Sequence, residues 1–457
     1  MTELTTLVLS HHPMKRGAMT RMNRSIAGKA ALAIAVAAAL TLSGCSGTPK
    51  AKSSGFDKDK KITLEMSWWG DDARAALFAQ VIDKFEAKYP NITVKQTPVG
   101  SPDDLFNRLA TDFGGGGTTA PDVFALGGAK PQEYGSAGAL LDLASVKKLV
   151  NADKYPDFST ISATVDGKLY GLPTGGNATA AFVNTDLFKK AGVPVPDAKW
   201  SWDDMISAAN KIGSAGLKTD TGAPVYGVDL RVQDIVGTYA AQVTKYGIYD
   251  FKGKLAVKPN DIAGLYKKEL KLKEGGGLPD PTVVTAGWNL PPDQQPYTLG
   301  QAAITFGYSN LIGTYQKGGT TIILPPPTDT KKNGVALLPS AFWSINAATK
   351  YPEASAMLMN WFLNEPSALK LIKDTRGVPF NPDMTAVVTP LLEGPSQEAA
   401  KYVKSVLDSG EVAPPQPNGG ANMNKYTQDE EAEVLFGRKT PQQAGEEWVQ
   451  KLGADLR

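Results

Sequence analysis

Cysteine and histidine are almost absent from this chain of 457 residues. The only cysteine is Cys45, and the only histidines are His11 and His12. Both histidines lie in an N-terminal segment that we expect to be removed, as argued below. The remaining chain could not use Ser-His-Asp or Cys-His catalysis. It would also lack structural disulfides and zinc sites of the usual Cys/His type.

A large excess of charge is lacking as well. The chain has 48 Lys and Arg against 46 Asp and Glu, for a formal net charge of +2. The first 44 residues hold five Lys or Arg and one Glu, so the rest of the chain carries a net charge of −2. This balance gives no electrostatic case for binding nucleic acid. We also find no internal repeat and no heptad pattern. Beyond the N-terminal segment, no apolar run is a candidate for spanning a membrane.

The N-terminal segment has the layout of an export signal. Basic residues from Lys15 to Lys29 precede an apolar run over residues 30–42, and small residues then lead to Cys45. This resembles a bacterial lipoprotein signal, in which the cysteine is acylated. The alternative, a transmembrane anchor, would need about 20 apolar residues. We therefore predict a signal peptide over 1–44, a lipid anchor on Cys45 at the outer face of the cell membrane, and a flexible tether over 45–60.

The chain beyond the tether is patterned as an α/β protein. Alternating apolar residues from Ile62 predict a strand, the spacing of Leu77, Val81 and Phe85 predicts a helix, and Ile92 begins a second strand. This order predicts a βαβ unit in a parallel sheet. Ligands of such sheets bind beyond the carboxyl ends of the strands, which is where Trp68 and Trp69 fall.

Later segments continue in the same style. Thr185 is the expected N-cap of a helix that runs to Lys190, and Ser201 is the expected N-cap of another. Prolines at 352, 366 and 441 are expected to begin three of the helices that dominate the C-terminal hundred residues. Residues 275–300 are rich in Gly and Pro, and we assign them only loop.

Several motifs, taken in order, resemble a known family. The first is Trp68-Trp69-Gly70 followed by a helix and Phe85-Glu-Ala-Lys-Tyr-Pro-Asn-Ile-Thr-Val94. The others are Ala120-Pro-Asp-Val-Phe124, Gly138-Ala-Leu-Leu-Asp-Leu143, Asp166-Gly-Lys-Leu-Tyr-Gly-Leu-Pro173, Asn184-Thr-Asp-Leu-Phe-Lys-Lys-Ala-Gly192, Trp200-Ser-Trp-Asp203, Leu299-Gly-Gln-Ala-Ala-Ile304 and Gly377-Val-Pro379. From residue 61 onward the chain resembles the family 1 extracellular solute-binding proteins that serve sugar ABC importers.

The resemblance implies a fold and a function. Two lobes, each a mainly parallel sheet flanked by helices, would be joined by a multi-strand hinge with crossings near 173–177, 305–308 and 341–346. The first lobe would comprise 61–175 and 306–345, and the second would comprise 176–305 and 346–457. A sugar or oligosaccharide would be captured between the lobes and delivered to the permease subunits of the importer. The protein would be a monomer without a cofactor or metal, and it would carry out no chemistry.

The candidate ligand-binding residues follow from the chemistry of sugars. Aromatic rings bury the apolar face of a sugar ring, and planar polar groups bind its hydroxyl rim. Neighbouring strand residues face opposite ways, so one of the first two tryptophans should point into its lobe, and we favour Trp69 for the ligand. The candidates lie at strand ends or crossings: Trp68, Trp69, Asp71, Arg74, Gly128, Asn177, Trp288, Tyr308, Asn310, Phe342, Trp343 and Arg376. Trp200, Trp202, Trp361 and Trp448 are expected to be packing residues instead.

Two other functions remain open at this stage. An extracellular glycosidase needs only two carboxylates, although no pair stands out in the sequence. A binding protein for a peptide, a polyamine or a metal is the other alternative. Metal binding is disfavoured by the missing imidazole and thiolate groups. A polyamine would call for an acidic cleft, whereas Arg74 and Arg376 suit an acidic sugar.

Overall fold

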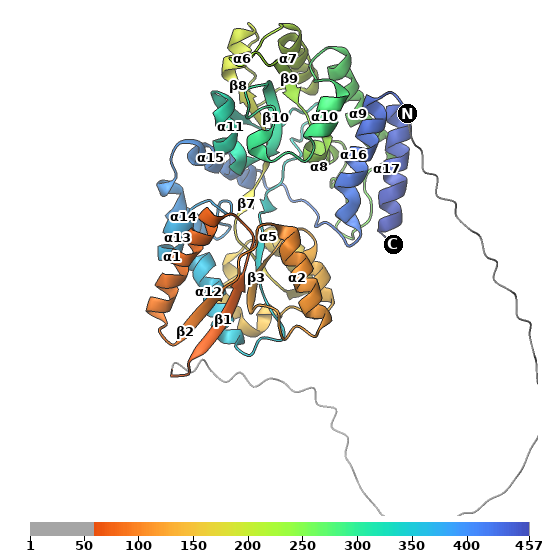
Figure 1. The fold of residues 1–457 in the computed structure, drawn as a ribbon. Helices are drawn as coiled ribbons and strands as arrows, with labels where there is room; N and C mark the ends of the chain where they lie inside the picture. The colour runs from red at the N-terminus through yellow and green to blue at the C-terminus, as the bar shows by residue number, and fades with distance from the viewer. Residues whose placement is uncertain (1–58, 457) are drawn as a thin grey trace, which may run out of the picture. The chain divides into compact units, whose positions relative to one another are not determined.

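The computed structural model describes residues 59–456, which form two lobes around separate sheets (Figure 1). The predicted signal peptide, Cys45 and nearly all of the predicted tether lie outside the described residues. Among the residues that are described, no helix is both long and apolar enough to cross a membrane.

The first lobe is built on a five-stranded sheet with the order β2-β1-β3-β13-β6. The predicted βαβ unit forms as β1 (Ile62–Ser67), α1 (Asp72–Lys88) and β2 (Ile92–Gln96), with β1 parallel to β2. Helix α1 starts because Asp71 caps it, and it buries Phe78, Val81, Ile82 and Phe85 against the sheet. The other elements of this lobe are α2 (Pro102–Gly114), β3 (Val123–Leu126), α3 (Lys130–Ser136), α4 (Lys147–Val150), α5 (Asp157–Thr160), β4 (Thr164–Val165), β5 (Lys168–Leu169), β6 (Leu172–Pro173), β13 (Phe342–Ile345), α12 (Pro352–Asn364), α13 (Pro366–Ile372) and α14 (Pro382–Val388).

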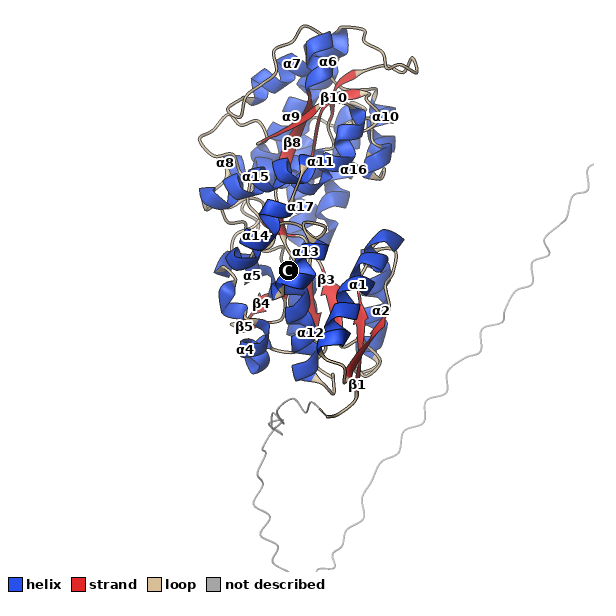
Figure 2. Cartoon of the chain, turned by 90° about the vertical axis from the view of Figure 1, so that its left-hand side faces the viewer, coloured by secondary structure: helices blue, strands red, loops and turns tan. Residues whose placement is uncertain are grey.

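The second lobe is built on a four-stranded sheet with the order β11-β8-β10-β9. Its core contains Trp202 and Trp448, both fully buried as expected from the sequence. Figure 2 shows its helices on both sides of the sheet. The elements are β8 (Thr179–Asn184), α6 (Thr185–Lys190), α7 (Trp202–Ser214), β9 (Tyr226–Asp229), α8 (Val232–Val243), α9 (Pro259–Glu274), α10 (Pro281–Gly287), β10 (Ala302–Tyr308), α11 (Ile312–Tyr315), β11 (Thr321–Leu324), α15 (Gly394–Ser409), α16 (Met423–Leu435) and α17 (Pro441–Asp455).

The two-lobe α/β fold is confirmed, and each sheet is mixed because one of its strands runs against the others. In the first lobe, β13 runs antiparallel to both β3 and β6. In the second lobe, β8 runs antiparallel to its two neighbours, β10 and β11, whereas β9 pairs with β10 in parallel. Strands β8 and β13 each follow directly after a crossing from the other lobe. Each therefore starts at the end of its sheet that faces the other lobe, where its neighbouring strands finish. For this reason each runs opposite to its neighbours.

Three backbone segments meet between the lobes. β7 (Gly176–Asn177) pairs with β12 (Leu338–Pro339), and Gly176 also exchanges backbone hydrogen bonds with Val378, at 2.7 and 3.1 Å. The contact is so close that a Cβ on Gly175 would lie 2.5 Å from the carbonyl oxygens of Arg376 and Gly377. β7 and β12 lie in crossings between the lobes and form the hinge of the two-lobe fold, and the segment 376–378 of the first lobe packs against them.

Two of the predicted crossings lie close to these segments, and the third does not. The chain crosses at 174–178, as predicted, and again at 338–341, next to the predicted 341–346. Residues 305–308 are instead the last four residues of β10, because that strand continues in register against β8 up to Tyr308. A crossing missed by the sequence lies between α14 and α15.

The predicted lobe boundaries beyond residue 305 therefore change. Strand β11 and helix α11 belong to the second lobe, although 306–345 was assigned to the first. Helices α12 and α13 pack on α1 in the first lobe, although 346–457 was assigned to the second. A hydrogen bond of 3.0 Å from the buried Trp361 Nε1 to the carbonyl oxygen of Val81 fixes α12 there. Two smaller corrections are that Asn184, not Thr185, caps α6, and that α10 lies within the expected loop 275–300.

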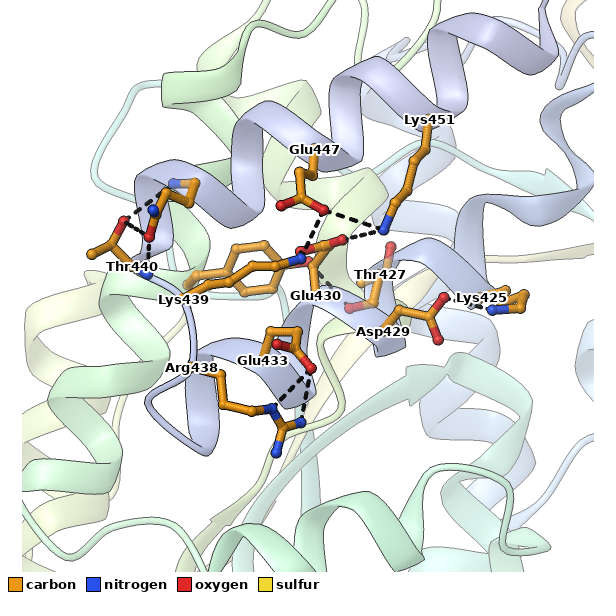
Figure 3. Close-up of polar contacts among 12 residues, drawn as sticks. Lys425, Thr427, Asp429, Glu430, Glu433, Arg438, Lys439, Thr440, Glu447 and Lys451 are labelled. Atoms are coloured by element: carbon orange, nitrogen blue, oxygen red, sulfur yellow. Dashed lines mark hydrogen bonds and ion pairs between the residues drawn. The ribbon is translucent and has the colours of Figure 1, made fainter.

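A buried carboxylate joins the last two helices. Glu430 of α16 is fully buried, and its oxygens accept hydrogen bonds from Lys439 Nζ at 2.8 Å and Lys451 Nζ at 2.6 Å (Figure 3). Glu447 of α17 pairs with both of these lysines. Each buried oxygen of Glu430 thus has a cationic partner, which offsets the cost of removing the carboxylate from water.

The adjacent carboxylate on α16 has no such cation. Glu431 and Glu269 of α9 are both fully buried, and neither forms an ion pair within the described residues. Burial raises the pKa of Glu431 to about 7, and burial together with the charge of Glu431 raises the pKa of Glu269 well above its ordinary value. The folded protein therefore holds protons here at a pH where the unfolded chain has released them.

We expect this pair to make stability depend on pH. Its contribution is fully present below about pH 4.5 and is lost as the pH rises through about 7. The free energy of unfolding of Glu431→Gln, relative to that of the wild type, should therefore be higher at pH 8 than at pH 5. Urea unfolding at both pH values measures this difference. Glu446→Gln, which changes an exposed carboxylate on α17, is the control. The assignment is contradicted if the free energy of unfolding differs between Glu431→Gln and the wild type by the same amount at both pH values.

Candidate functional site

A cavity of about 860 Å³ is lined by residues of both lobes. The first lobe contributes residues just beyond β1 and β3, where parallel strands place their ligands. The second lobe contributes the end of β10, the start of α8 and the segment 411–416 that follows α15. The volume lies in the upper part of the range of about 300–1,000 Å³ found for small-molecule sites.

The two adjacent tryptophans after β1 have different environments. Trp69 lines the cavity, half-buried, with its ring edge-on to Phe106 at 5.8 Å between centroids. Trp68 is fully buried and packs against Phe78 at 5.2 Å. Trp69 is thus the one of the pair that a ligand in the cavity can touch, and Trp68 belongs to the core of the first lobe.

Two arginines lie beside Trp69. The guanidinium carbon of Arg376 lies 4.8 Å from the centroid of the Trp69 ring. The Trp69 carbonyl oxygen accepts hydrogen bonds from Arg376 Nη2 at 2.7 Å and from Arg74 Nη1 at 3.3 Å. Burial, and then the charge of Arg74, lower the pKa of Arg376 to about 9. This end of the cavity is therefore rich in hydrogen-bond donors and positive charge.

The second-lobe end of the cavity has paired charges. Arg231, at the start of α8, forms an ion pair of 2.9 Å with Asp234. Burial opposes the charge of Arg231, but the charges of Asp229 and Asp234 raise its pKa. Burial raises the pKa of Asp234 to about 6, although Arg231 opposes this shift. Nearby, Tyr308 at the end of β10 exposes half of its surface and offers a second aromatic face.

The structure gathers most of the predicted site residues around this cavity. Those that line it are Trp69, Arg74, Gly128, Asn177, Trp288, Tyr308, Asn310, Phe342 and Arg376. Trp68, Asp71 and Trp343 do not. Asp71 instead accepts the backbone N–H of Arg74 at 2.9 Å as the cap of α1. Trp343 is buried on the opposite side of β13 from Phe342, and it packs on Phe362 at 5.5 Å.

Several lining residues were missed by the sequence analysis. Arg231, Gln233 and Asp234 follow β9 directly, so the rule that placed Trp69 beyond β1 could have found them. The loop residues 411–416 and Tyr246 carry no comparable signal, because only tertiary packing brings them to the cavity. Within residues 59–456 no cluster of three or more His, Cys, Asp or Glu side chains is placed to hold a metal ion.

The fold has two α/β lobes, and residues of both lobes line a ligand-sized cavity, which is an arrangement suited to the capture of a solute. The model of the bacterial extracellular solute-binding protein family matches residues 69–368, so the chain belongs to this family. Family membership confirms the resemblance drawn from the motifs, and it places the protein outside the cytoplasm.

The curated relatives include sugar-binding proteins. The arabinooligosaccharide-binding protein of Bacillus subtilis is 28% identical over 47% of this chain and 47% of its own length. The chain thus spans about half the length of this relative. The galactooligosaccharide-binding protein of the same organism is 24% identical over 90% of this chain and 93% of its own length. Among solved structures, a family 1 extracellular solute-binding protein of Alicyclobacillus acidocaldarius is 26% identical, with a TM-score of 0.68, and the match covers 88% of this chain and all of that one.

Proposed function

We propose that this chain is the substrate-binding component of an ABC importer, and that it captures a sugar or oligosaccharide outside the cytoplasmic membrane. The cavity carries the proposal. It combines two aromatic side chains from different lobes, Trp69 and Tyr308, with the donors of Arg74 and Arg376. Aromatic faces and planar donors are the groups that bind the two kinds of surface on a sugar ring. The names of the two Bacillus relatives support the same ligand class.

Ligand binding would favour the closed arrangement of the lobes. A ligand that contacts both Trp69 and Tyr308 gains its full set of contacts only when the lobes are close together, so binding shifts the population toward closure. The hinge strands β7 and β12 are each only two residues long, so closure would require backbone changes at few residues. The closed form would be the one that the permease subunits recognise. The predicted lipid on Cys45 would keep the monomeric protein near that permease.

Calorimetry of the purified protein against mono-, di- and oligosaccharides tests this function. Binding with the sugar recovered unchanged is the expected result. In a thermal-shift assay, a ligand present at 100 times its Kd should stabilise the fold by about 2.7 kcal/mol. Shorter sugar products would support a glycosidase instead. A response only to peptides or amines would overturn the sugar assignment.

A further inference from the structure

The first-lobe end of the cavity holds two arginines that lie close together. Arg376 exposes only 6% of its surface, and Arg74 is half-buried. Both guanidinium groups donate to the same carbonyl oxygen, that of Trp69, so they are close neighbours. In the described part of the chain neither group forms an ion pair with a carboxylate, and the Nε of each is buried without a hydrogen-bond partner.

The neighbouring charges make this arrangement unusual. The charge that acts on Arg376 is that of Arg74, which disfavours the protonated guanidinium. The carboxylate of Asp71 favours the charge on Arg74, but it is exposed and is engaged with the backbone N–H that it caps. Buried charges are normally paired, because removing an unpaired charge from water is costly.

The other end of the same cavity shows the normal pattern. Arg231 is as buried as Arg376, exposing 3% of its surface, and it has two carboxylates beside it, Asp229 and Asp234. Residues 59–456 therefore provide counter-charges for the buried arginine at one end of the cavity and none for the buried arginine at the other. The missing negative charge at the Trp69 end would have to come from the ligand.

We propose that Arg74 and Arg376 bind the carboxylate of an acidic oligosaccharide, with a uronic-acid ring placed at the Trp69 end of the cavity. This inference rests on the proposed sugar-binding function and specifies its substrate class. A carboxylate suits the site because its two oxygens match the planar fork of a guanidinium. The same ring could contact Trp69, since both arginines are anchored to the backbone of that residue. The paired charges around Arg231 would face the neutral part of the ligand.

Calorimetry with three matched ligands tests the proposal: a uronic-acid oligosaccharide, its methyl ester and its neutral counterpart. We expect the acid to bind about 10- to 100-fold more tightly than the ester, because the ester keeps the shape and loses the charge. Arg376→Gln and Arg74→Gln should each remove most of this preference, and Arg376→Lys should restore part of it. Arg74→Gln keeps the test valid if the more buried Arg376→Gln fails to fold. Arg438→Gln, at an exposed arginine of the second lobe, is the control.

The outcomes separate this inference from the proposed function. If the neutral sugar binds as tightly as the acid, the acidic-sugar inference is overturned and the sugar-binding function stands. If no sugar in the panel binds, both are overturned. Tighter binding of a sulfated analogue, measured beside these three ligands, would overturn the carboxylate assignment. A preference for the acid that survives both arginine-to-glutamine substitutions would show that these arginines are not the site.

Discussion

Replacing Trp69 with alanine is expected to weaken sugar binding by about 10- to 100-fold while leaving the fold nearly as stable as in the wild type. The affinity loss corresponds to the burial of one aromatic side chain, about 1.5–3 kcal/mol. Stability should change little, because the Trp69 ring lines the cavity and the hydrogen bonds to this residue use its carbonyl oxygen. Calorimetry gives the affinity and urea unfolding gives the stability. A variant that binds as tightly as the wild type would contradict the role of this ring.

Replacing the adjacent Trp68 with alanine should have the opposite profile. We expect a loss of about 3–5 kcal/mol in the free energy of unfolding, because the fully buried ring packs on Phe78 and its removal leaves a cavity. The affinity of the protein that remains folded should be unchanged, because Trp68 does not line the cavity between the lobes.

Trp68→Phe is the matched control for that prediction. The Nε1 of Trp68 has no hydrogen-bond partner in the described structure, so phenylalanine removes volume but no hydrogen bond. Its cost should be clearly smaller than that of alanine. If Trp68→Ala were as stable as the wild type in urea unfolding, the ring would not be part of the core.

Much of the site could be predicted from strand ends. The carboxyl ends of parallel strands meet at one edge of a sheet, and Trp69 after β1 and Gly128 after β3 both line the cavity. Alternation along a strand explains why two predicted residues do not reach the cavity. Trp68 faces away from its neighbour Trp69, and Trp343 faces away from its neighbour Phe342. The sequence does not show which member of such a pair faces the ligand, because all four are large and aromatic.

The hinge was harder to predict than the lobes. Residues 305–308 (Thr-Phe-Gly-Tyr) include a glycine, as the crossing at 174–178 does, but pairing with β8 keeps them inside a sheet. The apolar faces of α12 and α13 predict that these helices are buried, but not on which lobe. The hydrogen bond from Trp361 to Val81, across 280 residues of sequence, decides this. Contacts of this range depend on the tertiary fold, which local patterns do not specify.

The central claim is that the cavity between the lobes holds a sugar. A crystal structure of the protein grown with the sugar that binds most tightly in calorimetry tests this claim most directly. The account predicts a sugar ring against Trp69, contacts from Tyr308 of the second lobe, and an acidic group on Arg74 and Arg376. A ligand bound outside this cavity, with the Trp69 face unoccupied, would contradict it.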